Sequence, residues 1–463
     1  MNTKRRPMHA ASSATPARKA AFELVSRAHE QEVYLASIAE AVFEPYALDP
    51  SDKAFARLIA QGALSLQTTL DALIDRSLRS PRDIKPDVRD ALRISVYEII
   101  YLRKEDHAAV DQGVELVRHF APRATGVANY VLHRIVEEKE AFPYGDPRES
   151  LEAAALFYGF PQWLAHAVKK DIGTRNALTF MACSLEAAPV WFTNTTALSH
   201  GDLARALSEA GIEYDTCHAL AALEDADPIF QLAHRSDVGG VAFAALLRDD
   251  RIVVSDLSAQ SIVERAVGVL PPAGGRLLEI GAGRGTKTLL LQSACARRGV
   301  RLAVHDAMDI SAKKLRALER RIEAAGGSIT ATIAHDALKP AELPNAPYDL
   351  VFIDAPCTGV GTLRRHPEIK ARLKEDDSRA LAKMGQTMLE HAASQVAPQG
   401  HILYATCTIF KEENDKVIKR FLATPVGKGF EVVPIGSQSS SYFKTPITPN
   451  GPDLHFACLL RRK

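Results

Sequence analysis

Cysteine is scarce in this sequence, with six residues in a chain of 463. So few thiols cannot form the dense disulfide framework of a small secreted domain. Their spacing contains no C-x-x-C pair, so the pattern gives no support to a zinc or other metal site. We therefore expect a protein of the reducing cytoplasm that binds no metal. The six residues are Cys183, Cys217, Cys295, Cys357, Cys407 and Cys458.

Long apolar runs are missing as well. No stretch of eighteen apolar residues occurs, so we predict no membrane-spanning helix. The first six residues include Lys4, Arg5 and Arg6, but the alanine, serine and proline residues after them form no apolar core of a signal peptide. We expect residues 1–15 to be a disordered tail.

The sequence also has no excess of charge of either sign, because its 57 lysine and arginine residues are balanced by 56 aspartate and glutamate residues. A net charge of +1 argues neither for nor against nucleic-acid binding. Local charge is more informative, since five cations gather within residues 364–374. We predict that Arg364, Arg365 and Lys370 bind RNA phosphates, which dominate nucleic-acid affinity. A solvated helix face is the alternative for this cluster.

The length leaves room for two or three domains. Residues 17–138 carry apolar side chains at helical spacing, for example Leu92, Val96 and Ile99, without a strand pattern between them. In the C-terminal part, short apolar runs alternate with helical patterns, which is typical of an α/β fold. We therefore predict a multi-domain protein with an all-α domain at residues 16–140, a connector with a small α/β module at 141–255, and a Rossmann-like α/β domain at 256–463.

Two strand-like runs each end in a turn that carries a cysteine. Residues 349–354 lead into Cys357, and residues 401–406 lead into Cys407. In an open parallel sheet, ligands bind beyond the carboxyl ends of the strands. Both thiols are therefore expected in one crevice, where one serves as a thiolate nucleophile and the other as its helper. A small buried hydrophobe is the alternative for either cysteine.

A short apolar strand at residues 276–280 is followed by a glycine-rich loop and by a helix that begins near Lys287. Glycines at alternate positions permit positive φ angles and let the backbone pass close to a ligand. Thr286 stands where the dinucleotide fingerprint has its last glycine. The loop resembles instead the S-adenosyl-L-methionine loop of Rossmann-like methyltransferases, with a purely structural turn as the alternative. The predicted cofactor residues here are Glu279, Gly281, Ala282, Gly283, Arg284 and Gly285.

Carboxylates follow the next two strands. We predict that Asp309 accepts hydrogen bonds from ribose hydroxyls, because an acid after the second strand does so in dinucleotide folds. Asp306 is the competing candidate, and the alternative role for Asp309 is that of a helix N-cap. Asp336 follows the third strand, where it can accept from the edge of adenine or serve as a plain turn residue.

Two longer motifs carry a family resemblance. Residues 354–361 read D-A-P-C-T-G-V-G and are followed by R-R-H-P-E at residues 364–368. Residues 404–409 read Y-A-T-C-T-I and are followed by E-E-N at residues 412–414. Both motifs resemble the hallmarks of the NOP/Sun family of RNA 5-methylcytosine methyltransferases. The resemblance implies S-adenosyl-L-methionine as the cofactor and RNA as the substrate.

The N-terminal part points to one branch of that family. Softer patterns at residues 52–56, 107–111 and 127–132 resemble the NusB-like RNA-binding domain of the bacterial small-subunit rRNA methyltransferases. Residues 161–164 read P-Q-W-L, like an element of the family's RNA-contacting subdomain, whereas Phe192 stands where the family has an arginine. One phosphate contact is therefore expected to be absent. We expect a monomer that binds RNA, most directly 16S rRNA.

The resemblance also implies individual roles. In the family the cysteine of the T-C-S motif is the nucleophile and the cysteine of the Pro-Cys motif assists release, which correspond to Cys407 and Cys357. Asp354 would hold a proton against cytosine N3, and it also counts among the predicted cofactor residues. Lys287 matches the lysine of the family's cofactor loop, although Arg284 replaces that loop's proline.

The chemistry explains why two thiols are wanted. C5 of cytosine is a poor nucleophile, so a thiolate first adds to C6 and thereby activates C5 for attack on a sulfonium methyl. A base must then remove the C5 proton so that the thiolate can leave. The alternative is the reverse assignment, in which the cysteine of the Pro-Cys motif is the nucleophile, as in DNA cytosine methyltransferases. Those enzymes also carry a Glu-Asn-Val triplet, which this sequence lacks. Rival functions are a tRNA methyltransferase and a non-catalytic RNA-binding ribosome-assembly factor.

Overall fold

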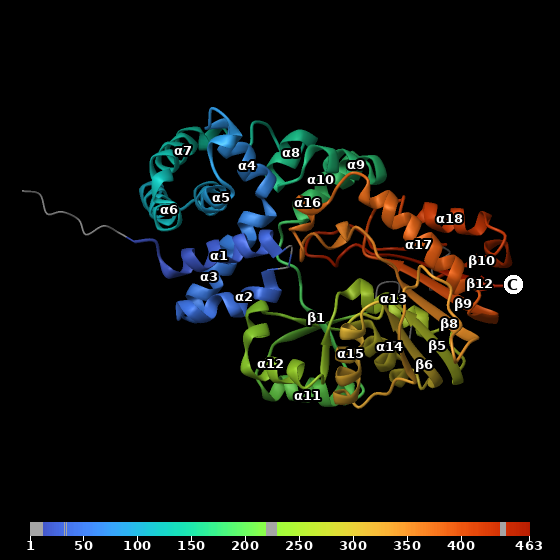
Figure 1. Ribbon diagram of the computed structural model, residues 1–463. Helices are drawn as coiled ribbons and strands as arrows, with labels where there is room; N and C mark the ends of the chain where they lie inside the picture. Colours follow the sequence, from blue (N-terminus) through green and yellow to red (C-terminus); the bar gives the residue numbers. More distant parts are fainter. Residues whose placement is uncertain (1–12, 32, 34, 219–228, 436–440) are drawn as a thin grey trace, which may run out of the picture. The chain divides into compact units, whose positions relative to one another are not determined.

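The computed structural model describes residues 13–31, 33, 35–218, 229–435 and 441–463 (Figure 1). The chain divides into two compact units. The helical unit comprises Met1–Leu185 together with His366–Leu373, and the sheet unit comprises Glu186–Arg365 together with Lys374–Lys463. The division after residue 185 lies inside the predicted connector, so the first three helices of that segment belong to the helical unit, whereas its strands and its last two helices belong to the sheet unit.

The helical unit is built around one buried helix. Its helices are α1 (Pro16–Gln31), α2 (Leu35–Phe43), α3 (Pro50–Ser65), α4 (Gln67–Arg76), α5 (Pro86–Ile100), α6 (Asp106–Phe120), α7 (Thr125–Glu138), α8 (Leu151–Tyr158), α9 (Gln162–Ile172) and α10 (Thr174–Cys183). Helix α5 is buried on nearly all sides because α1, α3, α4, α6 and α7 pack against it. Its buried Arg93 forms ion pairs with Asp71 and Asp90, which satisfy the charge inside the bundle.

A short segment from the C-terminal part of the chain completes the helical unit. It is His366–Leu373, and it contains α16 (Ile369–Arg372), which packs against α3. Lys370 Nζ donates to Tyr158 O at 2.7 Å, and Arg372 donates to Val33 O at 2.7 Å. The chain that follows the Cys357 turn is therefore held by N-terminal helices.

The sheet unit begins with a small antiparallel sheet of order β2-β3-β1-β4. Its elements are β1 (Trp191–Asn194), α11 (His200–Glu209), β2 (Tyr214–Cys217), β3 (Ile229–Leu232), α12 (Val241–Arg248) and β4 (Ile252–Val254). The ring of Phe192 is fully buried, stacks on Phe230 at 5.4 Å and meets Phe243 at 5.2 Å. The residue that stands where the family has an arginine is therefore a core residue of this module.

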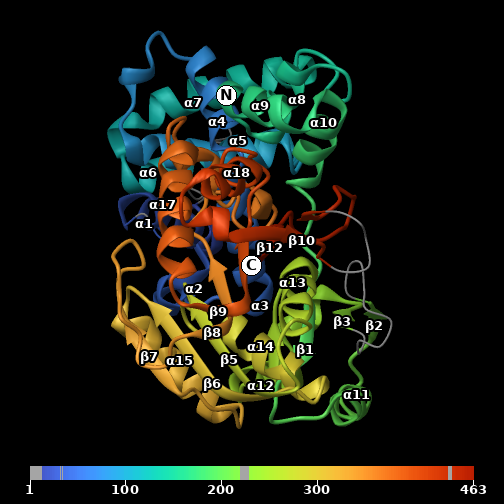
Figure 2. The ribbon, with the colours of Figure 1, turned by 90° about the vertical axis from the view of Figure 1, so that its right-hand side faces the viewer.

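The large sheet has the order β10-β12-β9-β8-β5-β6-β7, and β11 pairs with β12 (Figure 2). Its strands are β5 (Ala273–Ile280), β6 (Arg301–Asp309), β7 (Ala331–Ala334), β8 (Tyr348–Asp354), β9 (Val396–Thr406), β10 (Phe430–Val433), β11 (Phe443–Lys444) and β12 (Phe456–Arg462). The strands from β7 to β9 are parallel, whereas β10, β11 and β12 pair antiparallel. The order reverses between β5 and β8, which makes this the topological switch point where ligands bind.

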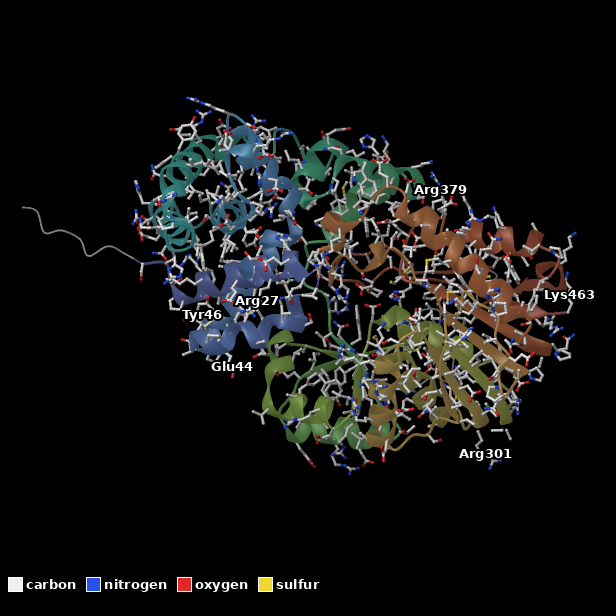
Figure 3. The ribbon with its side chains drawn as sticks, viewed as in Figure 1. Arg27, Glu44, Tyr46, Arg301, Arg379 and Lys463 are labelled. Carbon is white, nitrogen blue, oxygen red and sulfur yellow. The ribbon has the colours of Figure 1, made fainter. Side chains whose placement is uncertain are left out.

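Helices cover both faces of the parallel strands, which confirms the Rossmann-like α/β fold. Helices α13 (Leu257–Val267), α14 (Thr286–Arg297) and α15 (Ala312–Ala324) pack on one face, where Leu277 and Leu350 point. Helices α17 (Asp377–Ala393) and α18 (Asp415–Ala423) pack on the other, where Leu278 and Val351 point. Successive side chains of a strand alternate between faces, so one apolar run fills both cores. Figure 3 draws the side chains on the ribbon and labels Arg301, the first residue of β6.

Two negative findings apply to the described part of the chain. None of its helices combines the length and apolar content that a membrane crossing requires. Within the same residues, no group of three or more histidine, cysteine, aspartate or glutamate side chains is arranged to hold a metal ion.

Candidate active site

The two predicted thiols meet at the carboxyl ends of β8 and β9. The Sγ atoms of Cys357 and Cys407 lie 3.3 Å apart, and the backbone N–H of Cys407 donates to Cys357 Sγ at 3.3 Å. The hydrogen bond with Cys407, followed by burial, raises the pKa of Cys357 well above its usual value. Two adjacent thiols resist losing both protons, because the second charge would lie against the first. Cys357 is therefore the partner that keeps its proton.

Backbone contacts fix the turns that carry these thiols. Ala355 N–H donates to Ala405 O and Gly361 N–H donates to Cys407 O, each at 2.9 Å. A side chain at Gly361 would place its Cβ 2.8 Å from Cys407 O, which explains the glycine at that point of the motif. The two turns are thus joined by main-chain bonds that continue the pairing of β8 with β9.

An ion pair lies in the same crevice. Lys287 Nζ, at the start of α14, donates to Asp354 Oδ2 at 2.6 Å. Burial alone would lower the pKa of Lys287, but the attraction and hydrogen bond of Asp354 raise it, and Cys407 adds to this effect. Lys287 therefore stays charged beside Asp354.

The glycine loop passes directly over the end of β8. Gly281, Gly283 and Gly285 have positive φ angles of 84°, 59° and 86°. A Cβ at Gly281 would lie 2.6 Å from Asp354 O, and one at Gly285 would lie 2.9 Å from Leu318 Cγ. Only glycine fits both the conformation and the space. The loop has the form of a cradle for a ligand that approaches the backbone closely.

The structure distinguishes the two candidate acids of β6. Asp306 is fully buried within the sheet unit and accepts from Tyr348 OH at 2.6 Å and from Asn345 Nδ2 at 3.0 Å. Asp309 ends the strand, and its carboxylate accepts from Gly283 N–H at 3.0 Å and Ser311 N–H at 2.8 Å. The N-cap of α15 is Ser311, not Asp309. Asp309 therefore lies beside the glycine loop, to which its carboxylate is hydrogen bonded.

One neighbouring residue was missed by the sequence reasoning. Ile310 follows Asp309 directly and is 72% exposed, although it is a large apolar side chain. An exposed isoleucine at the rim of a crevice offers a flat apolar contact to an aromatic ring. The signal in the sequence was its place between the strand-end acid and the N-cap serine.

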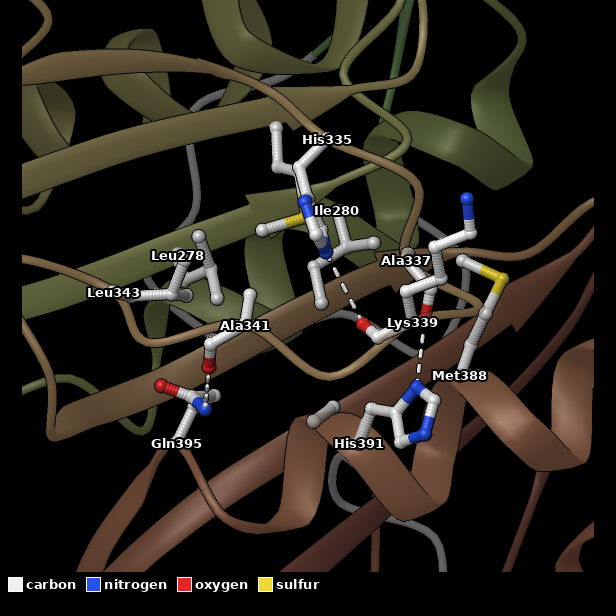
Figure 4. A pocket seen from close by; sticks show the side chains of 12 residues that line it. Leu278, Ile280, His335, Ala337, Lys339, Ala341, Leu343, Met388, His391 and Gln395 are labelled. Carbon is white, nitrogen blue, oxygen red and sulfur yellow. Dashed lines mark hydrogen bonds between the residues drawn. The ribbon is translucent and has the colours of Figure 1, made fainter.

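Asp336 lies on a loop that is fastened over a small apolar hollow between the large sheet and α17 (Figure 4). Asp336 Oδ1 accepts from Leu338 N–H at 3.0 Å. Figure 4 shows the loop bonded on both sides of this residue, by His335 to Lys339 O at 3.2 Å and by His391 to Ala337 O at 3.1 Å. These bonds hold the carboxylate after β7. The predicted site residues do not line the hollow, so we assign it no ligand.

Glu279 lies beneath the glycine loop, fully buried, and accepts from Thr288 Oγ1 at 2.6 Å. Burial raises its pKa to about 7. Burial also lowers the pKa of His305, 3.9 Å away, to about 4, so the histidine brings no compensating charge at neutral pH. The structure thus places Glu279 as a support of the loop and of α14, rather than on an open surface.

The raised pKa of Glu279 predicts a pH-dependent stability. Below about pH 4.5 the carboxyl is protonated in both states; from there to pH 7 only the unfolded state ionises, so stability falls by about 3 kcal/mol. Glu279→Gln should remove this loss, so its advantage over the wild type should grow by about 2–3 kcal/mol between pH 5 and pH 8 in urea unfolding. Glu323→Gln, at an exposed glutamate, is the control. If the difference in free energy of unfolding between Glu279→Gln and the wild type is the same at pH 5 and pH 8, the carboxyl of Glu279 is not protonated in the folded state.

The three cations predicted to bind RNA are engaged by the protein itself. Arg364 pairs with Glu186 at 3.2 Å, and Arg365 pairs with Asp256 at 3.0 Å and Asp453 at 2.7 Å, all within the sheet unit. Lys370 is only 1% exposed in the helical unit, and burial lowers its pKa to about 7. This placement differs from the predicted basic RNA surface, because side chains distant in the sequence supply the partners.

Comparisons with known proteins agree with this arrangement. A sequence model of the family described as 16S rRNA methyltransferase RsmB/F matches residues 267–444, and one of the NusB family matches residues 15–137. The ribosomal RNA small subunit methyltransferase B of Pseudomonas putida is 30% identical over 383 residues, covering 82% of this chain and 83% of that protein. Its Xanthomonas campestris counterpart is 28% identical over 399 residues, covering 85% and 84%.

A solved structure shares the fold over the whole chain. The crystal structure of PH0851 has a TM-score of 0.76 and covers 98% of this chain and 100% of its own, at 22% sequence identity. At that identity the likeness concerns the fold alone. It extends over both the helical and the α/β parts of the chain.

Proposed function

We propose, from the premise that the chain belongs to the family of 16S rRNA methyltransferases RsmB/F, that it methylates C5 of one cytidine in 16S rRNA. The chain is an RNA methyltransferase, and S-adenosyl-L-methionine is its methyl donor. We further propose that the methyl group goes to C5 of the base, that the reaction passes through a covalent adduct with a cysteine, and that the RNA is 16S rRNA. The observation that carries it is the pair of thiols 3.3 Å apart beside the Lys287–Asp354 ion pair.

The residues at the switch point fit the methyl donor. The loop Gly281–Gly285 leaves room for a ligand close to the backbone at Gly283, where an added Cβ would meet nothing nearer than Gly281 O at 3.9 Å. Asp309 would accept from the ribose hydroxyls, Asp336 from the edge of adenine, and Ile310 would cover a face of the ring. S-adenosyl-L-methionine supplies, when bound, an electrophilic methyl group on its sulfonium.

Cys407 is the proposed nucleophile. Its thiolate, favoured by the charge of Lys287, adds to C6 of cytosine, and the electrons of the C5–C6 double bond become available at C5 for methyl transfer. Cys357 keeps its proton while Cys407 is ionised, because the two thiols are hydrogen bonded. Once Cys407 is bonded to carbon its charge is gone, and Cys357 can lose its proton to solvent. It then takes the proton of C5, and the bond between Cys407 Sγ and C6 breaks.

Asp354 is proposed to act on the other side of the base. It would hold a proton between its carboxylate and cytosine N3, so that the charge reaching N3 during attack is neutralised. The 2.6 Å bond to Lys287 fixes the orientation of this carboxylate. The cytidine must leave its stack to reach the crevice, which favours a loop or another unpaired region of the RNA.

The proposal is tested by transfer of tritiated methyl from S-adenosyl-L-methionine to unmodified 16S rRNA, followed by mapping of the label. We expect 5-methylcytosine at a single cytidine. Label in tRNA alone would identify tRNA as the substrate in place of 16S rRNA. RNA binding without methyl transfer to any RNA would favour a non-catalytic assembly factor. Cys407→Ala serves as the negative control in the same assay.

A further inference from the structure

The residues that follow the two cysteines are joined by a buried hydrogen-bond network. Thr358 follows Cys357, and Thr408 follows Cys407. The hydroxyl oxygens of these threonines lie 2.8 Å apart. The carboxylate of Glu413, which is 1% exposed, accepts from Thr358 N–H at 2.7 Å and from Thr358 Oγ1 at 2.9 Å. The carboxylate of Glu413 is therefore linked directly to the Cys357 turn and, through the hydroxyl of Thr358, to the Cys407 turn.

The direction of each hydrogen bond follows from the groups present. A carboxylate accepts only, so the hydroxyl of Thr358 donates to Glu413. Thr358 Oγ1 must then accept from the hydroxyl of Thr408, whose oxygen in turn accepts from Phe410 N–H at 3.3 Å. The network is thus a chain of hydrogen bonds from Phe410 N–H through Thr408 and Thr358 to the buried carboxyl of Glu413. Hydrogen bonds in a buried chain polarise one another, so the network is stronger than its separate bonds.

The backbone that carries Glu413 is itself tied to β9. Tyr404 OH donates to Glu413 O at 2.9 Å. The side chain of Asn414 donates to Thr408 O at 2.8 Å and accepts from Thr406 Oγ1 at 2.6 Å. These hydrogen bonds fix the backbone position of Glu413, and thereby the position of its carboxylate beside the turns.

The neighbouring glutamate of the same motif has no part in this network. Glu412 pairs instead with Lys416 at 2.8 Å and with Arg420 at 2.6 Å on α18. Two adjacent glutamates thus have separate tasks, one on the helix surface and one under the cysteine turns. Glu412 is for that reason a matched control for Glu413.

We propose that Glu413 is a positioning residue that, through Thr358 and Thr408, sets the separation of the thiols of Cys357 and Cys407. The inference rests on the proposed function, because both thiols take part in that reaction. Reacting groups gain most of their rate from fixed geometry, and a displacement of about 1 Å can cost about 100-fold. The network therefore supports the covalent route without touching the base or the methyl donor.

The separation can be measured without RNA or methyl donor. Diamide, a diazene oxidant, couples the two thiols; each gives up a proton and an electron, and the diazene becomes a hydrazine. The Cys357–Cys407 disulfide is followed over time by mass spectrometry of the linked peptides. We expect Thr358→Val and Glu413→Gln to slow its formation at least about fivefold, because the turns are no longer held together. Thr358→Ser and Glu412→Gln should react at the wild-type rate.

Methyl transfer gives the second readout. Thr358→Val should lower kcat about 10- to 100-fold and leave KM for RNA and for the methyl donor unchanged. Thr358→Ser should restore kcat, since it keeps the hydroxyl. Thr387→Val on α17, where the hydroxyl donates only to Lys383 O at 3.1 Å, is the control for loss of a threonine hydroxyl.

Failure of this inference is distinct from failure of the proposed function. Wild-type coupling rates in both Thr358→Val and Glu413→Gln would overturn the positioning role, as would a rise in KM without loss of kcat. A wild-type protein that transfers no methyl to RNA would instead refute the proposed function, while the coupling rates still decide the role of Glu413. Melting curves identify a variant that does not fold, and Thr358→Val, which loses one hydroxyl, then carries the test.

Discussion

Cys407→Ala should abolish both methyl transfer and the covalent adduct with RNA, with a loss of at least about 10³-fold in kcat. The reason is that no other group can add to C6, so the activation of C5 disappears with the thiolate. The loss is measured as tritiated methyl transferred in a single turnover. Adduct is measured as protein that migrates with RNA under denaturing conditions.

Cys357→Ala should give the opposite result for the adduct. Without the second thiol the C5 proton is not removed, so the bond between Cys407 and C6 persists and the adduct accumulates. Cys217→Ala, in the small antiparallel sheet, should behave as the wild type. Adduct in Cys407→Ala but not in Cys357→Ala would reverse the two roles and contradict the assignment made from the raised pKa of Cys357.

Asp354→Asn should lower kcat by about 10²- to 10³-fold, the second largest effect we expect. The asparagine keeps the size of the side chain but cannot hold a proton against N3, and Lys287 loses its charged partner. Binding of S-adenosyl-L-methionine, followed by calorimetry, separates this loss from damage to the cofactor site. A normal kcat in Asp354→Asn would exclude the proposed contact with the base.

Lys287→Met tests the other member of the Lys287–Asp354 ion pair. It leaves Asp354 without a cation and removes a positive charge that interacts with Cys407, so adduct formation should slow by at least about tenfold. The control is Lys416→Met, which breaks an ion pair of 2.8 Å on the surface of α18 and should leave the rate unchanged. An equal loss in both variants would assign the effect to stability.

Local pattern was enough to predict the elements that carry the site. The runs at residues 349–354 and 401–406 lie within β8 and β9, since apolar runs bounded by turns form buried strands wherever helices cover both faces. The third strand, predicted to precede Asp336, is β7 (Ala331–Ala334) in the structure. Asp336 itself lies on the loop after it, where its carboxylate accepts from Leu338 N–H.

Contacts between distant residues could not be predicted in this way. Arg365 finds Asp256 and Asp453, 109 and 88 residues away, so a cluster of cations in the sequence is not a basic surface in the fold. Asp306 and Asp309 are three residues apart on one strand, and only the fold shows that Tyr348 of β8, on the far side of β5, donates a hydrogen bond to Asp306. The role of Glu413 depends likewise on the approach of two turns.

The sequence by itself determined the chemistry of this protein: which residues can act as thiolates, where strands stop and turns begin, and which loop requires glycine. These properties belong to single residues and their chain neighbours, so they are readable without a fold. The tertiary structure decided the distances, namely thiols at 3.3 Å, an ion pair at 2.6 Å and, on the two turns, threonine hydroxyls at 2.8 Å, one of which donates to Glu413. Separation in space depends on how strands pair, and that is a property of the whole sheet.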